Sequence, residues 1–330
     1  MKFRTDLEIQ PTERKITHAR PVFGIGSCFV ESMGEKLKES KFQVITNPFG
    51  NLFHPLAIEN ALARILSLTK YTPDEIFKFG EVFFSWDHHT SFSQISLDAT
   101  LNKINSELEL ANDFIQKADV FLLTFGTAWV YRIKEMGIFV ANCHKVPNSN
   151  FDKYLLDDKQ IQASLKNCFN LILDINPNAQ IIATVSPVRH TKDGIVENSL
   201  SKSKLISNLY DVAQKFETVE YFPAYELMMD DLRDYRFYKK DLVHPSDMAV
   251  DYIWEKFSST YFDSETNEKI KIAEKIGKAI AHRPLNSSTT SYKEFLYKTG
   301  KKIESVESLF PKNSFEPEKS LLHNLMKNAD

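Results

Sequence analysis

Two short stretches of the chain carry residue types that could catalyse acyl transfer. In the first, Gly24-Ile25-Gly26-Ser27, a serine hydroxyl follows a glycine pair, and the second is Asp241-Leu242-Val243-His244. A serine hydroxyl is a weak nucleophile until a base removes its proton. An aspartate three residues before a histidine can accept the imidazole Nδ1–H on a turn, which leaves Nε2 facing the serine. The pattern therefore predicts Ser27 as nucleophile, His244 as base and Asp241 as orienting acid.

Each stretch also has a simpler interpretation. Ser27 alone would most often be a helix N-cap, and Asp241 and His244 could cap a helix that starts near Ser246. Cys28 could itself be a nucleophile, although a cysteine in this place is more often a small buried hydrophobe. The catalytic interpretation is preferred because it explains the serine and the Asp-x-x-His pair together.

Glycine is scarce in this chain, which makes its positions informative. There are 10 glycines in 330 residues, less than half of the usual share of roughly 7%. Gly24, Gly26, Gly50 and Gly126 lie at or just past the ends of expected strands, the edge at which open parallel sheets bind ligands. A phosphate- or nucleotide-binding loop is the alternative at Gly24 and Gly26, but the third glycine of a dinucleotide fingerprint is replaced by Phe29.

The elements that must position these residues alternate between strands and helices. The expected strands are 21–25, 42–46, 119–125, 180–185 and 219–222, with helical patterns between them. This alternation predicts a parallel sheet covered by helices on both faces. Residues 76–95 are aromatic with interleaved polar side chains, which indicates a hairpin or a long structured loop.

Two domains are expected, a core over residues 1–260 and a helical or irregular appendage over residues 261–330. The appendage is rich in lysine, glutamate and serine, and residues 310–330 are expected to be loosely ordered.

Composition excludes several classes of protein. With a formal net charge of −3 and 42% hydrophobic residues, the chain has neither the basic footprint of a nucleic-acid or membrane-surface protein nor the composition of a disordered one. Its 3 cysteines show no disulfide spacing. The polar N-terminus and the lack of an apolar run of about 18 residues indicate a reduced, cytoplasmic protein without a membrane segment. Neither a cofactor nor a metal is expected, and the sequence leaves the oligomeric state open.

The sequence around Ser27 and a series of later motifs resemble a known family. Gly26-Ser27-Cys28-Phe29-Val30 looks like the signature after which the GSCFA domain family is named, with valine in place of the final alanine. The resemblance extends over most of residues 20–260 through a series of short motifs: Asn47-Pro48-Phe49-Gly50-Asn51, His54-Pro55, Thr124-Phe125-Gly126-Thr127, Ser186-Pro187-Val188, Asn198 with Ser201-Lys202, Tyr235-Arg236-Phe237-Tyr238, and Asp241-Leu242-Val243-His244-Pro245-Ser246. The family is itself similar to a branch of the SGNH/GDSL hydrolases. The resemblance implies a three-layer α/β/α sandwich of SGNH type, flavodoxin-like, with a five-stranded, mostly parallel sheet.

The resemblance also implies roles for individual residues. It assigns Ser27, Asp241 and His244 to the catalytic triad, and amides of Ser27 and Gly50 to the oxyanion hole. In the wider superfamily the third motif ends in an asparagine that also donates to the oxyanion, but this chain has Ala128 there. Loss of one such donor costs about 3–4 kcal/mol in other acyl-transfer enzymes. Thr127 Oγ1 or the Asn51 side chain is expected to substitute, or the hole has two amides alone.

Two candidate substrate contacts lie in the run Trp86-Asp87-His88-His89. A substrate-binding rim is expected here, with Trp86 stacking on a sugar face and His89 donating a hydrogen bond, and plain packing is the alternative. Adjacent histidines point to opposite sides of a strand, so the run is not expected to bind a metal.

Three more candidate substrate contacts are His54, Asn198 and Lys202. Asn198 and Lys202 are one helical turn apart and share a face, so they could hold a polar or anionic group or form a solvated helix end. His54 could be core packing or pocket wall. Arg189-His190 follows a strand and could also rim the pocket, but a surface loop is the preferred interpretation.

These features predict a serine esterase, with a small-molecule or glycan acyl ester, such as an O-acetylated carbohydrate, as substrate. Water or a second alcohol could be the acyl acceptor, so both a deacetylase and an O-acyltransferase are open. The alternative is a catalytically weak or inactive domain that binds a glycan or a protein partner, which Ala128 favours.

Overall fold

The computed structural model describes residues 5–286 and 288–329. Packing divides the chain into two compact units. The sheet unit comprises the segment ending at Ile9, Val22–Gly34 and Ile45–Lys256, and the C-terminal unit comprises Gln10–Pro21, Glu35–Val44 and the chain from Phe257 onward.

The sheet unit is built on a parallel sheet of five strands in the order β10-β9-β5-β1-β2. The strands are β1 (Val22–Gly26), β2 (Val44–Thr46), β5 (Val120–Phe125), β9 (Gln180–Val185) and β10 (Val219–Tyr221). This is the flavodoxin-like order, in which the switch point lies between the first and third strands, here β1 and β5. The predicted fold class and all five strands are confirmed.

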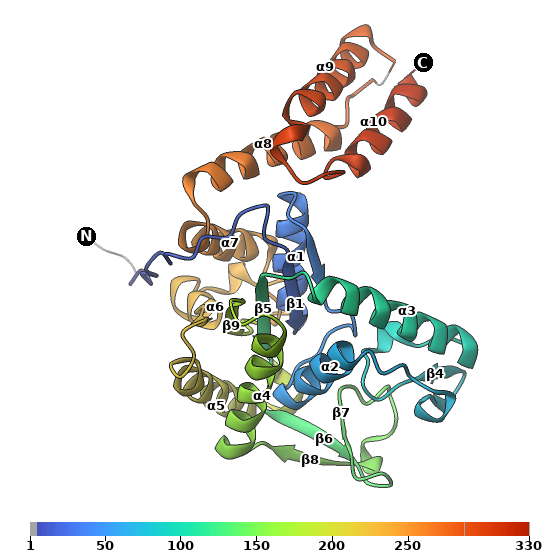
Figure 1. Cartoon of the computed structure of the whole chain (residues 1–330), viewed down its shortest axis with the longest axis vertical. Coiled ribbons are helices and arrows are strands. Elements are labelled where there is room, and N and C mark those ends of the chain that lie inside the picture. Colours follow the sequence, from blue (N-terminus) through green and yellow to red (C-terminus); the bar gives the residue numbers. More distant parts are fainter. Residues whose placement is uncertain (1–4, 287, 330) are drawn as a thin grey trace. The chain divides into compact units, whose positions relative to one another are not determined.

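Helices cover both faces of this sheet. They are α1 (Cys28–Glu39), α2 (Pro55–Ser67), α3 (Leu97–Ile115), α4 (Asp158–Ile175), α5 (Ile195–Ala213), α6 (Ala224–Glu226) and α7 (Asp247–Tyr261). On one face α4 packs against both α2 and α5 (Figure 1), and their apolar residues share one core with Phe23 and Ile25 of β1. On the other face α1 approaches closely, because a Cβ added at Gly24 would lie 2.9 Å from Val30 Cγ2.

Two small antiparallel sheets extend the unit. β3 (Phe77–Phe79) and β4 (Val82–Phe84) form a hairpin, as the aromatic segment 76–95 predicts. β6 (Trp129–Ile133) pairs with both β7 (Phe139–Val140) and β8 (Phe151–Leu155). Because β6 starts four residues after β5 ends, this sheet lies next to the carboxyl edge of the central one.

The C-terminal unit is helical. Its helices α8 (Ser264–Ala281), α9 (Thr290–Val306) and α10 (Glu316–Ala329) share a core that includes Ile276, Leu296 and Leu322. Residues 310–330 are therefore not loosely ordered as far as they are described, since Phe315 and Leu322 are buried and α10 begins at Glu316. None of the helices in the described ranges combines the length and apolar character of a transmembrane span.

Candidate active site

Parallel pairing brings the sequence-predicted motifs to one edge of the sheet. Gly26 at the end of β1 pairs with Thr124 of β5, and Phe125 pairs with Val185 of β9. The residues that follow these strands, Ser27, Gly126 and Ser186, therefore lie at the same level. The segment after β2 joins them, because Leu52 N–H donates to Gly26 O and Gly126 N–H donates to Phe53 O.

Ser27 lies on a sharp strand-to-helix turn. Gly26 has a φ of 141°, and a Cβ there would lie 2.1 Å from Thr124 O, so only glycine fits. Ser27 N–H donates to Thr124 O (3.0 Å), and Ser27 Oγ accepts from Phe29 N–H (3.4 Å) at the start of α1. The serine is completely buried. In this conformation its hydroxyl therefore caps the helix and is not accessible to solvent.

Asp241 and His244 form a hydrogen-bonded pair on a turn. His244 Nδ1–H donates to Asp241 Oδ2 (2.8 Å), and Asp241 Oδ1 accepts from the N–H groups of Val243 and His244 (2.9 and 3.0 Å). These bonds, the His244 N–H first, lower the pKa of Asp241 to about 2. Both side chains are about half exposed. The imidazole is thus held by Nδ1 with Nε2 open, as the Asp-x-x-His spacing predicts.

Arg189 fastens this turn to the sheet edge. Its Nη2 donates to Leu242 O (2.6 Å), and its guanidinium lies over the Tyr238 ring at 4.6 Å. Lys239 N–H donates to His244 O (2.8 Å) and closes the turn at its base. The loop expected at Arg189 is therefore anchored to the Asp241–His244 turn, a role that the sequence did not indicate.

The serine and the histidine are not joined in this conformation. Within residues 5–286, which include both, no hydrogen bond links Ser27 Oγ to His244 Nε2. The turn nevertheless lies at this edge, because Arg189 in the loop after β9 donates from its backbone N–H to Val243 O (3.4 Å) and from its side chain to Leu242 O (2.6 Å). Burial raises the pKa of the Cys28 thiol to about 11, which disfavours Cys28 as the nucleophile.

All four predicted oxyanion donors are engaged within the protein. Besides the Ser27 amide, Gly50 N–H donates to Asn47 O (2.7 Å), Thr127 Oγ1 bonds Ser201 Oγ (3.0 Å) and Asn51 Nδ2 donates to Glu31 Oε2 (3.4 Å). Asn51 has the longest of these bonds. Ala128, where the superfamily asparagine was expected, is fully buried in the core, and its N–H donates to Ser201 Oγ (2.7 Å).

Trp86 is not on a rim. Its side chain is buried in an aromatic cluster, edge to face with Phe84 at 4.7 Å and near Phe151 at 5.8 Å. The sugar-stacking position expected for Trp86 is therefore wrong, because the aromatic residues of β4 and β8 enclose the indole. His89, in contrast, lies beside Gly50: a Cβ added at Gly50, which has a φ of 73°, would be 2.4 Å from His89 Cβ.

His54 is occupied by structure. Ala57 N–H donates to its Nδ1 (3.1 Å) as the N-cap of α2, so Nε2–H donates to Val140 O (3.1 Å). Burial lowers the pKa of His54 to about 4, so the ring is neutral. Of the two interpretations open for His54, the ring bonds support packing, although the residue also borders a cavity.

Asn198 and Lys202 are buried and share one face of α5, as their spacing predicts. Asn198 Oδ1 accepts from His190 N–H (2.8 Å), and Lys202 Nζ donates to Ser186 O (2.7 Å). Burial lowers the pKa of Lys202 to about 7. Both side chains therefore hold the backbone of the loop that follows β9. Because both are buried, the interpretation of this segment as a solvated helix end is excluded.

His190 lines a cavity beside the carboxyl edge of the sheet, the position given by the less favoured of the two interpretations of Arg189-His190. Its ring meets Phe53 edge to face at 5.0 Å, and a Cβ added at Gly126 would lie 2.9 Å from His190 Nε2. The loop over residues 186–194 has no periodicity from which the burial of its side chains could be predicted. Among the described residues, no three His, Cys, Asp or Glu side chains converge as metal ligands would.

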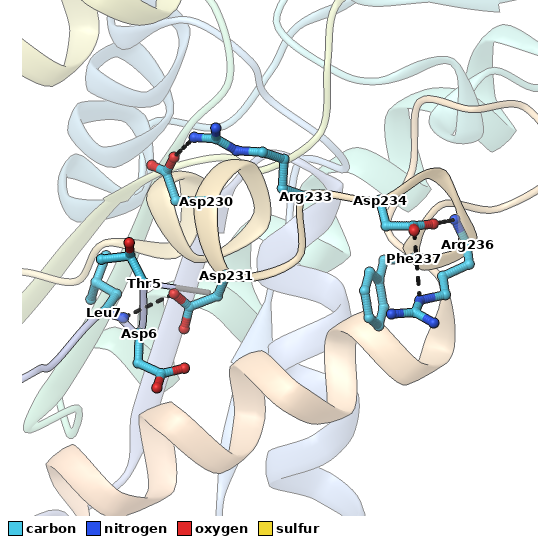
Figure 2. A pocket seen from close by; sticks show the side chains of 9 residues that line it. All are labelled: Thr5, Asp6, Leu7, Asp230, Asp231, Arg233, Asp234, Arg236 and Phe237. Carbon is cyan, nitrogen blue, oxygen red and sulfur yellow. Dashed lines mark hydrogen bonds and ion pairs between the residues drawn. The ribbon is translucent and has the colours of Figure 1, made fainter. Parts of the chain in front are cut away.

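A larger cavity lies elsewhere in the sheet unit. Its volume is about 780 Å³. Figure 2 shows the residues that line it, which are residues 5–7 and six residues between Asp230 and Phe237. Its charges are paired internally: Asp231 accepts from Leu7 N–H (2.9 Å), Asp230 pairs with Arg233, and Asp234 with Arg236. None of the predicted site residues lines it.

Comparisons with known proteins give a family and a distant fold likeness. Residues 21–257 match the GSCFA family, and residues 273–328 match the GSCFA domain protein, C-terminal domain. No curated protein matches the chain. A carbohydrate esterase family 3 from Talaromyces cellulolyticus aligns at 11% identity and a TM-score of 0.27, over 49% of this chain and 63% of that one. An acetyl xylan esterase from the rumen bacterium Butyrivibrio proteoclasticus aligns at 11% identity and a TM-score of 0.36, over 77% of this chain and 67% of that one. This chain thus spans less than two thirds of the first esterase.

Proposed function

The chain belongs to the GSCFA family, and from this premise we propose that it is a serine hydrolase that cleaves acyl esters of carbohydrates. The observation that carries the proposal is the Asp241–His244 hydrogen bond of 2.8 Å, on a turn anchored at the sheet edge where Ser27 directly precedes α1. An imidazole held by a carboxylate, with its second nitrogen open, is the arrangement that a general base requires.

In the proposed reaction Ser27 Oγ attacks the ester carbonyl while His244 Nε2 takes the serine proton. The proton then passes to the departing sugar oxygen, which leaves an acyl-Ser27 intermediate. Water, or a second alcohol, attacks this intermediate with His244 again as base, and Ser27 regains its proton. The conformation described above is the covered state of this cycle, and the exposed His244 must approach Ser27 once the ester is bound.

To stabilise the oxyanion, a hydrogen-bond donor must first leave its present partner within the protein. Asn51 is the best candidate of the four, because its Nδ2–H bond to Glu31 is the longest at 3.4 Å. Its Oδ1 accepts from Asn47 Nδ2 (2.8 Å), and Asn47 in turn binds Gly26 N–H, so Asn51 is held next to the nucleophile turn. His89 beside Gly50 is retained as a substrate contact.

A binding domain without turnover is the second candidate function. It is favoured by a specific observation: all four predicted oxyanion donors have partners inside the protein, and Ala128 lies in the core.

Labelling with a fluorophosphonate probe separates the two. Wild-type protein should be labelled at Ser27 and should hydrolyse a short-chain chromogenic ester, whereas S27A should do neither. The matched control is S186A, which removes another buried serine hydroxyl at the same edge and should be labelled like the wild type. Absence of labelling in the wild type, or equal labelling of S27A, would leave only the binding domain.

A further inference from the structure

A cavity of about 370 Å³ lies just past the end of β5, at the edge of the sheet where the proposed nucleophile also lies. Its wall includes Phe53, Thr127, Trp129, Tyr131, Asn142 and His190. Its volume falls within the range of about 300–1,000 Å³ that is usual for small-molecule sites.

The position of this cavity links it to Ser27. Phe53 O accepts from the N–H groups of both Gly126 and Thr127, so the cavity wall begins where β5 ends. Ser27 N–H donates to Thr124 O, two residues earlier on the same strand. A ligand in the cavity would therefore lie next to the nucleophile turn.

His190 has unused hydrogen-bonding capacity at this wall. Its backbone N–H is fixed by Asn198 Oδ1 and its ring by Phe53, but its buried Nε2 has no partner among the described residues. Burial lowers the pKa of His190 to about 3, so the ring is neutral. A buried polar atom without a partner is destabilising, and a hydrogen bond from a ligand group can relieve this.

Two other residues that line the cavity have a strained backbone. His144 and Lys145 have φ values of 47° and 62°, consecutive left-handed residues that are not glycine. They are held there because His144 N–H donates to Asn142 Oδ1 (2.9 Å) and the His144 ring stacks on Phe84 at 4.2 Å. Backbone strain of this kind is concentrated in ligand-binding segments.

The wall chemistry selects the ligand. Trp129 Nε1–H donates to Glu197 O (3.1 Å) and Tyr131 OH donates to Asp193 (2.9 Å), so both residues offer ring surface while His190 and Asn142 offer polar atoms. A long acyl chain would bury those polar atoms without partners. We propose that this cavity binds the saccharide part of the ester and that His190 is its hydrogen-bonding contact. Only the identity of the ligand as an ester rests on the proposed function.

Calorimetric titration of S27A with a mono-O-acetylated methyl glucoside tests this assignment, because the ester then stays intact. S27A should bind the glucoside, and S27A/H190A should bind it roughly tenfold more weakly, the effect of one hydrogen bond. S27A/H190F keeps a ring against Phe53 but has no ring nitrogen, so it should show the same loss even if the alanine variant unfolds. S27A/H323A, which removes an exposed histidine of α10, should bind like S27A.

The outcomes are distinct from those of the labelling experiment. Unchanged affinity in the H190F variant, preference for a long-chain alkyl ester or an anionic sugar, or no binding of the glucoside would each overturn the assignment, whether or not Ser27 is labelled. Binding that depends on His190 in a protein that the fluorophosphonate does not label would support the cavity and reject the hydrolase.

Discussion

Asp241 accepts three hydrogen bonds from a single turn, two from backbone N–H groups and one from the His244 ring. In D241N, the amide oxygen can still accept from the backbone, but the amide nitrogen would face His244 Nδ1–H. The imidazole would then favour the other tautomer, with Nε2 protonated and unable to act as base. We expect kcat to fall by about 10²–10⁴-fold while the fold is retained, measured by ester hydrolysis and circular dichroism.

The matched control for D241N is D247N. Asp247 opens α7 three residues after His244, and its side chain is 95% exposed. It should keep wild-type kcat. If D241N is as active as D247N, then Asp241 does not orient the base.

At the residue scale, sequence predicted what depends on local spacing and failed where the fold decides. The Asp241–His244 pair closes within three residues, so its geometry is a property of the turn. Trp86 was wrongly expected at a rim because an aromatic run with mixed polar residues does not reveal which side is enclosed. Its enclosure is completed by Phe151, which is 65 positions away and packs there only through the pairing of β6 with β8.

At the element scale, the turn that carries His244 depends on a second loop. Arg189 reaches from the end of β9 to Leu242 O and covers Tyr238 with the same guanidinium. A lysine cannot make both contacts. R189K should therefore lower kcat by between about tenfold and hundredfold, with little change of KM, because misplacement of a catalytic group by about 1 Å has an effect of this size.

Two further measurements separate positioning from folding in R189K. The melting temperature should stay close to that of the wild type, and the rate of fluorophosphonate labelling should fall in parallel with kcat. R233K is the control, since Arg233 is exposed and pairs with Asp230 and not with the turn. A normal labelling rate in R189K would contradict the positioning role.

The central sheet was predictable because continuous apolar runs identify buried parallel strands. β5 and β9 are buried along their whole length, as their sequences indicate. β6, β7 and β8 escaped prediction for the opposite reason: β7 has two residues, and β8 has one buried residue, Phe151, with aspartate and lysine next to it. Such strands form only when a partner strand is present, and the cavity wall depends on them.

At the scale of the whole chain, the C-terminal unit includes segments that the sequence cannot assign to it. Phe42, before β2, stacks on His18 at 4.1 Å and on Phe262 at 5.2 Å. Lys41 pairs with Glu318 of α10. The contacts with Phe262 and Glu318 join residues more than 200 positions apart, and no local sequence pattern predicts them.

The sheet unit as a whole buries several histidines in neutral form, which makes its stability depend on pH. Burial lowers the pKa of His54 and His144 to about 4 and of His190 to about 3, and it holds the pKa of His88 well below its usual value. Below pH 6.5 these histidines bind protons in the unfolded chain but stay neutral in the folded unit. The free energy of unfolding should therefore fall as the pH drops from 6.5 to 4, by as much as about 1.4 kcal/mol per pH unit for each ring.

His88 offers the cleanest test of this dependence. Its ring is fully buried against Phe49 at 4.2 Å, and neither ring nitrogen has a partner among the described residues. H88L removes one such ring. In urea unfolding between pH 7.5 and 4.5, the free energy of unfolding should therefore fall less steeply with pH than in the wild type, by a slope that corresponds to the uptake of about one proton. H323A, which removes an exposed histidine, should keep the wild-type slope. A slope that H88L leaves unchanged would mean that His88 takes up its proton inside the folded unit, and its burial would then contribute nothing to acid unfolding.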